Sequence, residues 1–124
     1  MKRVRIYLRS IKANERDQLM LFDSNRNAAI NDLVTVAPAG SIVIWKHDRC
    51  SGIKKILKIY SKTGKGNVFR TEPKKHWLFN VFCLKLSKEA EGEEAYSIDY
   101  LLKSKKRITI DPIILIPPPP SHEP

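Results

Sequence analysis

Residues 33–45 read Leu-Val-Thr-Val-Ala-Pro-Ala-Gly-Ser-Ile-Val-Ile-Trp. Two apolar runs, residues 33–36 and 42–45, lie on either side of Pro38-Ala39-Gly40 and are short enough to be β-strands. Proline fixes φ and glycine permits a positive φ, so this tripeptide is typical of a turn. The stretch therefore predicts a turn between two strands, and the rest of the chain extends the same pattern.

Short apolar runs separated by turn residues recur along the chain at intervals of about 8–12 residues, the spacing typical of a sandwich or barrel. Residues 3–9 alternate, with Val4, Ile6 and Leu8 on one face. Residues 14–22 suit either a short amphipathic helical turn or a strand. The remaining runs of strand length are 53–59, 68–69, 77–86, 96–102 and 108–116. We therefore expect an all-β chain of about seven or eight strands.

Residues 77–86 carry apolar and aromatic side chains at both odd and even positions. Trp77 and Phe79 would lie on one face of a strand and Leu78 on the other. Such a run suits a central strand that is covered on both sides. Cys83, which lies within it, is then expected to be a small core residue.

Residues 33–45 resemble the early strands of cupredoxin-like β-sandwiches, in which a turn of the Val-x-Pro-Gly type precedes a strand that ends in Trp. The departure here is Ala39, inserted between the proline and the glycine. Tyr96-Ser-Ile-Asp-Tyr100 followed by Ile110-Asp-Pro-Ile113 is similar to the late strands of small cytoplasmic cupredoxin-like proteins of unassigned function. The resemblance implies a Greek-key β-sandwich of two packed sheets, of the cupredoxin or immunoglobulin type.

The resemblance does not extend to the copper site. Blue-copper proteins bind the metal through histidine and cysteine, with a methionine as a weak axial ligand. Here the histidines are His47, His76 and His122, and the methionines are Met1 and Met20. Because no histidine follows closely after the second cysteine and both methionines lie far upstream, we expect neither copper nor any other cofactor.

The chain of 124 residues is long enough for one hydrophobic core and too short for two. We expect a single β-sandwich domain over residues 1–116. Residues 117–124 read Pro-Pro-Pro-Pro-Ser-His-Glu-Pro, and consecutive prolines favour a polyproline II conformation, so we expect a disordered tail. The tail is either a plain end of the chain, which we favour, or a ligand of the SH3 type.

No segment predicts export or insertion into a membrane. Arg5 and Arg9 interrupt the apolar stretch that a secretory signal needs, and no window approaches the roughly 20 apolar residues of a membrane-spanning helix. The two cysteines, Cys50 and Cys83, are expected to be reduced thiols, although a disulfide between them is compatible with the sequence. We therefore expect a cytoplasmic protein without a membrane partner.

The net charge of +10 is concentrated in two segments. Residues 1–12 carry +5, and residues 46–75 carry ten basic and two acidic residues, or +8, while the remainder of the chain is slightly acidic. We expect eight basic residues of the second segment to lie on one hairpin-like stretch and its approach. These candidate binding residues are Lys54, Lys55, Lys58, Lys62, Lys65, Arg70, Lys74 and Lys75.

A concentrated basic surface suits a partner of opposite charge. We expect an interaction module that binds a protein with an acidic surface or acts within a larger assembly, and the alternative is a nucleic-acid-binding protein. Tyr60, Phe69 and Trp77 are interleaved with the lysines and would stack on bases if they were exposed. Against this, lysines at strand edges also prevent edge-to-edge aggregation, and aromatic residues commonly belong to the core.

No motif predicts an enzyme. His47-Asp48-Arg49-Cys50 offers metal ligands or a Cys–His pair in principle, but these residue types are also those of a polar turn, which is the interpretation we favour. The four glutamates of residues 87–94 indicate an exposed acidic connection, which does not supply paired catalytic carboxylates. Thr63-Gly64-Lys65-Gly66 lacks the spacing of a phosphate-binding loop. We expect neither catalysis nor a small-molecule substrate.

Overall fold

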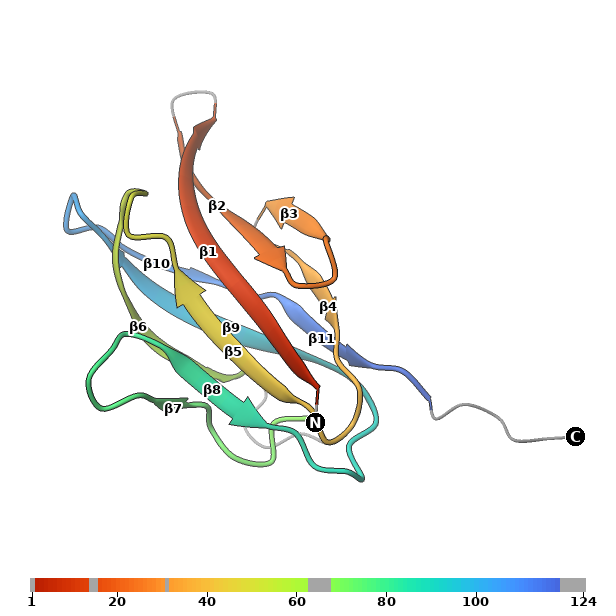
Figure 1. Ribbon diagram of the computed structural model, residues 1–124. Helices are drawn as coiled ribbons and strands as arrows, with labels where there is room; N and C mark the ends of the chain where they lie inside the picture. The colour runs from red at the N-terminus through yellow and green to blue at the C-terminus, as the bar shows by residue number, and fades with distance from the viewer. Residues whose placement is uncertain (1, 14–15, 31, 63–67, 119–124) are drawn as a thin grey trace, which may run out of the picture.

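The computed structural model describes residues 2–13, 16–30, 32–62 and 68–118. These residues form eleven β-strands and no helix (Figure 1). In chain order the strands are β1 (Arg3–Ala13), β2 (Arg16–Asp23), β3 (Ala28–Ile30), β4 (Val34–Val36), β5 (Ile42–His47), β6 (Ile53–Ser61), β7 (Lys74–Lys75), β8 (Phe82–Lys85), β9 (Gly92–Leu102), β10 (Arg107–Ile110) and β11 (Ile113–Ile116).

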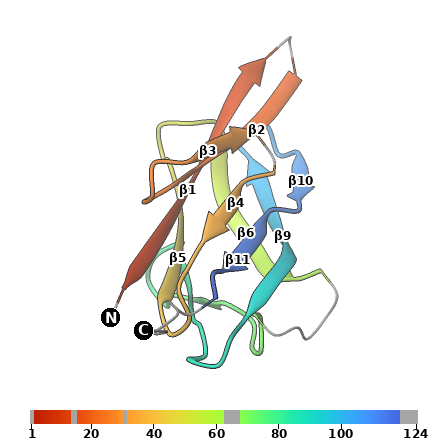
Figure 2. The same cartoon turned by 90° about the vertical axis from the view of Figure 1, so that its right-hand side faces the viewer.

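The strands form two mixed sheets that pack face to face (Figures 1 and 2). The first sheet has the order β3-β2-β1-β5-β8-β7, in which β1 and β5 are parallel and the other neighbours are antiparallel. In the second sheet β9 pairs with β6 along one side and with β10 and β11 along the other, and β4 lies parallel to β11. The expected all-β sandwich is confirmed, with eleven strands over the described residues in place of about seven or eight.

The turn predicted at residues 38–40 is present, and it joins the two sheets. Gly40 has a φ of +80°, a conformation that favours glycine, and the Ser41 amide donates a hydrogen bond to the Pro38 carbonyl at 3.1 Å. β4 lies in the second sheet and β5 in the first. The chain therefore crosses the sandwich at this turn instead of closing a hairpin.

Strand β6 has an irregular pattern of apolar residues because it contains two bulges. Ile53, Ile56 and Ile59 are all buried although they are three residues apart, a spacing that a regular strand cannot place on one face. The register with β9 shifts between Ile53 and Lys55 and again between Ile56 and Lys58. Each bulge adds a residue on this strand, so the next isoleucine returns to the core while the intervening lysines stay exposed.

Three aromatic rings fill the core between the sheets. Trp45 of β5, Tyr96 of β9 and Phe69 are buried, and the Trp45 and Tyr96 rings meet edge-on with centroids 5.6 Å apart. The Trp45 Nε1–H donates to the Tyr96 hydroxyl at 3.1 Å, and the Phe69 ring stacks on Tyr96 at 5.1 Å. Since β5 and β9 belong to different sheets, this cluster connects the two layers.

The interpretation of residues 77–86 as a central strand covered on both sides is wrong. Only Phe82–Lys85 form a strand, and its outer neighbour is the two-residue edge strand β7. Buried and exposed side chains alternate along β8, and the alternation turns Cys83 toward solvent. Cys83 is therefore not a core residue. Residues 77–79 precede the strand and lie in the loop between β7 and β8.

The sequence left two alternatives each for residues 14–22 and for the proline-rich tail, and the structure decides only the first. Residues 14 and 15 lie outside the described part of the chain, and residues 16–22 belong to the strand β2, which pairs with β1 and β3. The proline-rich tail follows β11. Pro117 and Pro118 are exposed, and the rest of the tail lies outside the described residues.

Candidate interaction surface

The eight basic residues predicted to bind a partner are distributed over both sheets. Seven of them belong to the described residues and all seven are exposed, while Lys65 lies outside that part of the chain. The seven are Lys54, Lys55 and Lys58 within β6, Lys62 directly after it, Arg70 before β7, and Lys74 and Lys75, which form β7. β6 pairs with β9, whereas β7 pairs with β8. The basic residues therefore do not form one hairpin; five of the seven lie on an edge strand of one sheet or the other, and Lys62 and Arg70 lie outside these strands.

Asn80 connects these two edges. It lies in the loop between β7 and β8, and its Nδ2 donates to the Ile56 carbonyl of β6 at 2.9 Å while its Oδ1 accepts from the Ile56 amide at 2.7 Å. These two bonds replace those that a neighbouring strand would make. β6 and the β7–β8 segment consequently lie side by side, on the left of Figure 1. We call Lys54, Lys55, Lys58, Lys74 and Lys75 the basic edge.

Part of the positive charge on this side is compensated by ion pairs. The pairs are Lys58–Glu72 at 3.9 Å, Lys62–Asp111 at 3.4 Å and Arg70–Glu89 at 3.7 Å. All of these carboxylates are open to water, and exposed pairs of this kind contribute little free energy. Lys54, Lys55 and Lys74 have no ion pair within the described residues. The basic edge therefore keeps a positive charge that is available to a partner.

The loop between β7 and β8 exposes three consecutive large apolar side chains. Trp77 is 82% exposed, Leu78 59% and Phe79 52%. Nδ1 of His76 accepts hydrogen bonds from the amides of Leu78 at 3.1 Å and Phe79 at 3.4 Å. The His76 ring also stacks on those of Trp77 and Phe79, with centroids 6.1 and 5.3 Å apart. We call Trp77, Leu78 and Phe79 the apolar tip; its own loop holds it in place, and it was missed by the sequence interpretation.

A hollow beside the apolar tip carries positive charge. It is lined by Lys46, His47, Arg49, Phe79, Asn80 and Val81, and none of these six is acidic. Burial lowers the pKa of His47 below its usual value of 6.5, and Arg49 acts in the same direction. His47 is therefore neutral at neutral pH, and the positive charge of the hollow comes from Lys46 and Arg49.

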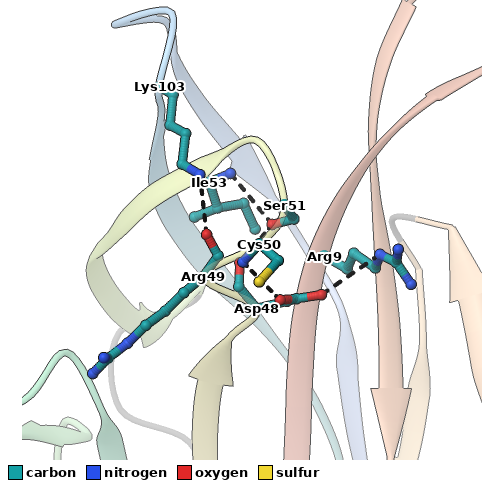
Figure 3. Close-up of polar contacts among 7 residues, drawn as sticks. All are labelled: Arg9, Asp48, Arg49, Cys50, Ser51, Ile53 and Lys103. Carbon is teal, nitrogen blue, oxygen red and sulfur yellow. Dashed lines mark hydrogen bonds and ion pairs between the residues drawn. The ribbon is translucent and has the colours of Figure 1, made fainter.

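His47 ends β5, and Asp48–Ser51 form a turn whose polar groups bond to one another (Figure 3). Asp48 Oδ1 accepts from the Cys50 amide at 2.8 Å, and Asp48 Oδ2 pairs with Arg9 at 3.6 Å. The Ser51 hydroxyl donates to the Asp48 carbonyl at 2.7 Å. The Asp48 carboxylate thus stabilises the turn. Within the described residues, no three His, Cys, Asp or Glu side chains gather in a way that could hold a metal ion.

The interpretation of Glu94 as part of an exposed acidic connection is wrong, because Glu94 is buried in β9. Its Oε2 accepts from the Ser61 hydroxyl at 2.5 Å, and its Oε1 accepts from the amides of Val68 and Phe69 at 3.2 and 3.3 Å. Three donors offset the cost of burying a carboxylate. The other three glutamates of residues 87–94 are exposed, as expected.

Of the three aromatic residues considered for stacking on bases, Trp77 alone is exposed. Phe69 is buried in the aromatic core. Tyr60 is half-buried, and the Lys58 ammonium lies 5.1 Å from the centre of its ring. The nucleic-acid interpretation therefore retains one fully accessible ring of the three that the sequence offered.

The described residues include no helix with the length and apolar character needed to cross a lipid bilayer. A scan of the chain against models of known protein families gives no match, and a search of the curated proteins gives none either.

Proposed function

We propose that this protein is a non-enzymatic interaction module whose basic edge binds a protein partner with an acidic surface, alone or within a larger assembly. One observation carries this proposal: two hydrogen bonds between Asn80 and Ile56 join the loop that follows Lys74 and Lys75 to the strand that carries Lys54, Lys55 and Lys58, and all five lysines are exposed. Lys54, Lys55 and Lys74 keep their full charge, since they lack ion pairs within the described part of the chain. Such a patch steers an acidic partner toward it and favours association at low salt.

The contacts of two carboxylates support the non-enzymatic part of the proposal. Asp48 accepts a hydrogen bond within the turn Asp48–Ser51, and Glu94 accepts three hydrogen bonds from Ser61, Val68 and Phe69. Both carboxylates thus stabilise the fold through these hydrogen bonds.

We further propose that the sandwich is of the cupredoxin type, without a copper site, and that the protein is cytoplasmic. The turn at residues 38–40 lies between strands of opposite sheets. Tyr96–Tyr100 lie in β9, and Ile110-Asp-Pro-Ile113 connects the end of β10 to the start of β11, both of which pair with β9. These features support the likeness that the sequence shows. Cys50 and Cys83 are both free and exposed, which suits a reducing compartment.

Nucleic acid is the second candidate partner. The exposed ring of Trp77 favours it, because this ring follows Lys74 and Lys75 in the chain and an accessible aromatic beside cations is a platform on which bases stack. Both candidates need the same lysines, so an experiment has to separate protein from nucleic acid directly.

The test is affinity capture from the cell of origin, with and without nuclease, using the wild type and two charge variants. Lys54→Glu with Lys55→Glu changes the basic edge, whereas Lys2→Glu with Arg3→Glu makes the same change in net charge at the exposed start of β1. We expect the wild type and the β1 variant to capture the same protein in the presence of nuclease and the β6 variant to lose it. Capture that needs intact nucleic acid, or that ignores the β6 reversal, would contradict the proposal.

A further inference from the structure

The apolar tip exposes much more hydrophobic surface than isolated side chains usually do. Trp77, Leu78 and Phe79 are 82%, 59% and 52% exposed, which amounts to roughly 400 Å² if large side chains present about 150–250 Å² each. Contiguous apolar patches of this size on soluble domains mark sites of interaction. A stable protein–protein interface buries about 800 Å² on each partner, so the tip alone is too small for one.

The structure holds the tip in an exposed position. His76 Nδ1 accepts hydrogen bonds from two amides of the loop. In addition, the Val81 amide donates to the Phe79 carbonyl at 2.9 Å, and the His76 amide donates to the Val81 carbonyl at 2.8 Å. These bonds close the loop on itself, while Asn80 anchors its base to β6. The three side chains are therefore already ordered before they bind, which lowers the entropic cost of binding.

The charges around the tip are positive. Lys46 and Arg49 line the hollow that Phe79 also lines, and Lys74 and Lys75 precede the loop. The two carboxylates nearest in sequence to these cations are already paired, Asp48 with Arg9 and Glu72 with Lys58. An apolar projection flanked by cations matches a surface that is anionic at its outer layer and apolar below it.

We propose that the apolar tip inserts into the headgroup region of an anionic lipid bilayer, with Lys46 and Arg49 contacting lipid phosphates. Tryptophan and phenylalanine are favoured at the membrane interface, where Trp77 can keep its indole N–H hydrogen-bonded to headgroups. Anionic lipids attract basic residues near the surface. A bilayer accommodates a convex tip of this size, whereas a protein partner would need a pocket of matching shape.

This surface role goes beyond the proposed function and is compatible with it. The expectation from sequence that there is no membrane partner considered membrane-spanning segments, and insertion of a loop tip needs none. The tip and the hollow lie beside β8 and β5, while Lys54 and Lys55 lie on β6. Lys74 and Lys75 belong to both surfaces, so variants at Lys54 and Lys55 test the first proposal and variants at the tip, Lys46 and Arg49 test the second.

The chain contains a built-in reporter for the test. It has two tryptophans: Trp45 is fully buried and Trp77 is 82% exposed. Mixing the protein with vesicles of phosphatidylcholine and phosphatidylserine should shift the Trp77 emission to shorter wavelength, and vesicles of phosphatidylcholine alone should give little change. The Trp77→Phe variant should still sediment with the anionic vesicles but without the spectral shift.

Two variants test the parts of the site separately. Replacing the tip by serine (Trp77→Ser, Leu78→Ser, Phe79→Ser) should abolish sedimentation with the anionic vesicles. Neutralising Lys46→Gln and Arg49→Gln should weaken vesicle binding by about thirtyfold, on the scale known for two juxtamembrane cations. The Lys54→Glu, Lys55→Glu variant should keep the spectral shift, which separates this result from a failure of the basic edge. Since the changed side chains are exposed, an unchanged circular dichroism spectrum would show that each variant is folded.

Three results would overturn the proposal. The first is that wild-type protein does not bind the anionic vesicles at low salt. The second is that binding survives the serine substitutions, since the tip would then be irrelevant. The third is that polyglutamate or a single-stranded oligonucleotide shifts the Trp77 emission while the vesicles do not, because the tip would then serve an acidic polypeptide or nucleic acid.

Discussion

Replacing Glu94 by leucine removes the common acceptor of three buried donors. In the native protein its carboxylate accepts from the Ser61 hydroxyl at 2.5 Å and from the amides of Val68 and Phe69 at 3.2 and 3.3 Å. Leucine occupies a similar volume but accepts no hydrogen bond. The variant therefore leaves these donors in the core without a partner and releases the segment around Phe69 from β9.

The size of the effect follows from these contacts. A buried donor without a partner costs about 1–3 kcal/mol. The two amides share one oxygen at rather long distances, so the cost of losing each bond lies at the lower end of this range. The bond to Ser61 is short, so the cost of losing it lies near the middle. Burying the leucine side chain returns about 1–2 kcal/mol. We expect a net loss of about 2–3 kcal/mol, which is a large part of the about 5–15 kcal/mol that stabilises a typical domain.

Urea unfolding followed by circular dichroism measures this loss as a lower midpoint at unchanged slope. Glu94→Gln keeps one carbonyl oxygen for the two amides and can pair with the Ser61 hydroxyl, so we expect a loss of about 1 kcal/mol or less. Glu93→Leu is the control, because Glu93 is the exposed neighbour on the same strand and its replacement should change stability by less than about 0.5 kcal/mol. The reasoning fails if Glu94→Leu is as stable as Glu93→Leu, or if glutamine is as damaging as leucine.

Two further predictions concern the contacts between the sheets. Asn80→Ala removes both bonds to Ile56, so we expect a loss of about 1–2 kcal/mol and faster hydrogen exchange of the Ile56 amide in particular; unchanged exchange there would show that Asn80 does not connect the edges. Tyr96→Phe leaves the Trp45 indole N–H without its acceptor, which should cost about 1–3 kcal/mol in urea unfolding at neutral pH. Burial also raises the pKa of Tyr96 well above its usual value of 10.0, so the folded state disfavours ionisation more than the unfolded state does. The wild type should therefore lose stability as the pH rises above 10 and Tyr96→Phe should lose less, whereas equal losses would contradict the assignment.

The all-β fold was predictable because its strongest signals are local. The turn at residues 38–40 needs a proline and a glycine at fixed positions, and both the turn and the flanking strands occur where the sequence places them. Which sheet each strand joins was not predictable. β4 pairs with β11 and β5 with β1, and these partners are far apart in the chain.

The errors arose where local composition does not determine exposure. Residues 77–86 are mostly hydrophobic, yet the side chains of residues 77–79 remain exposed because these residues lie in the loop between β7 and β8 and not in a strand that faces the core. A usable signal was Asn80, which interrupts the apolar run and is a common turn residue. Its contact with Ile56 joins residues 24 positions apart and has no local signature.

Glu94 shows the opposite case, in which an available signal was overlooked. Tyr96, Ile98, Tyr100 and Leu102 are buried at every second position of β9, and Glu94 continues that alternation by one step. Its place next to other glutamates suggested a solvated connection. The period-two pattern of the strand is the better guide because it reflects which face the backbone turns toward the core.

The exposed lysines and the apolar tip differ in how specifically they indicate function. β6 and β7 are edge strands, and lysines and bulges on edges prevent pairing with other chains, so lysines would be expected there even in a protein without a partner. The tip has no such explanation, because exposed Trp77, Leu78 and Phe79 promote the association that edge protection prevents. Nδ1 of His76 accepts hydrogen bonds from the amides of Leu78 and Phe79, and Asn80 joins the loop to Ile56 of β6. The exposed tip is therefore a more specific indication of an interaction than the lysines are.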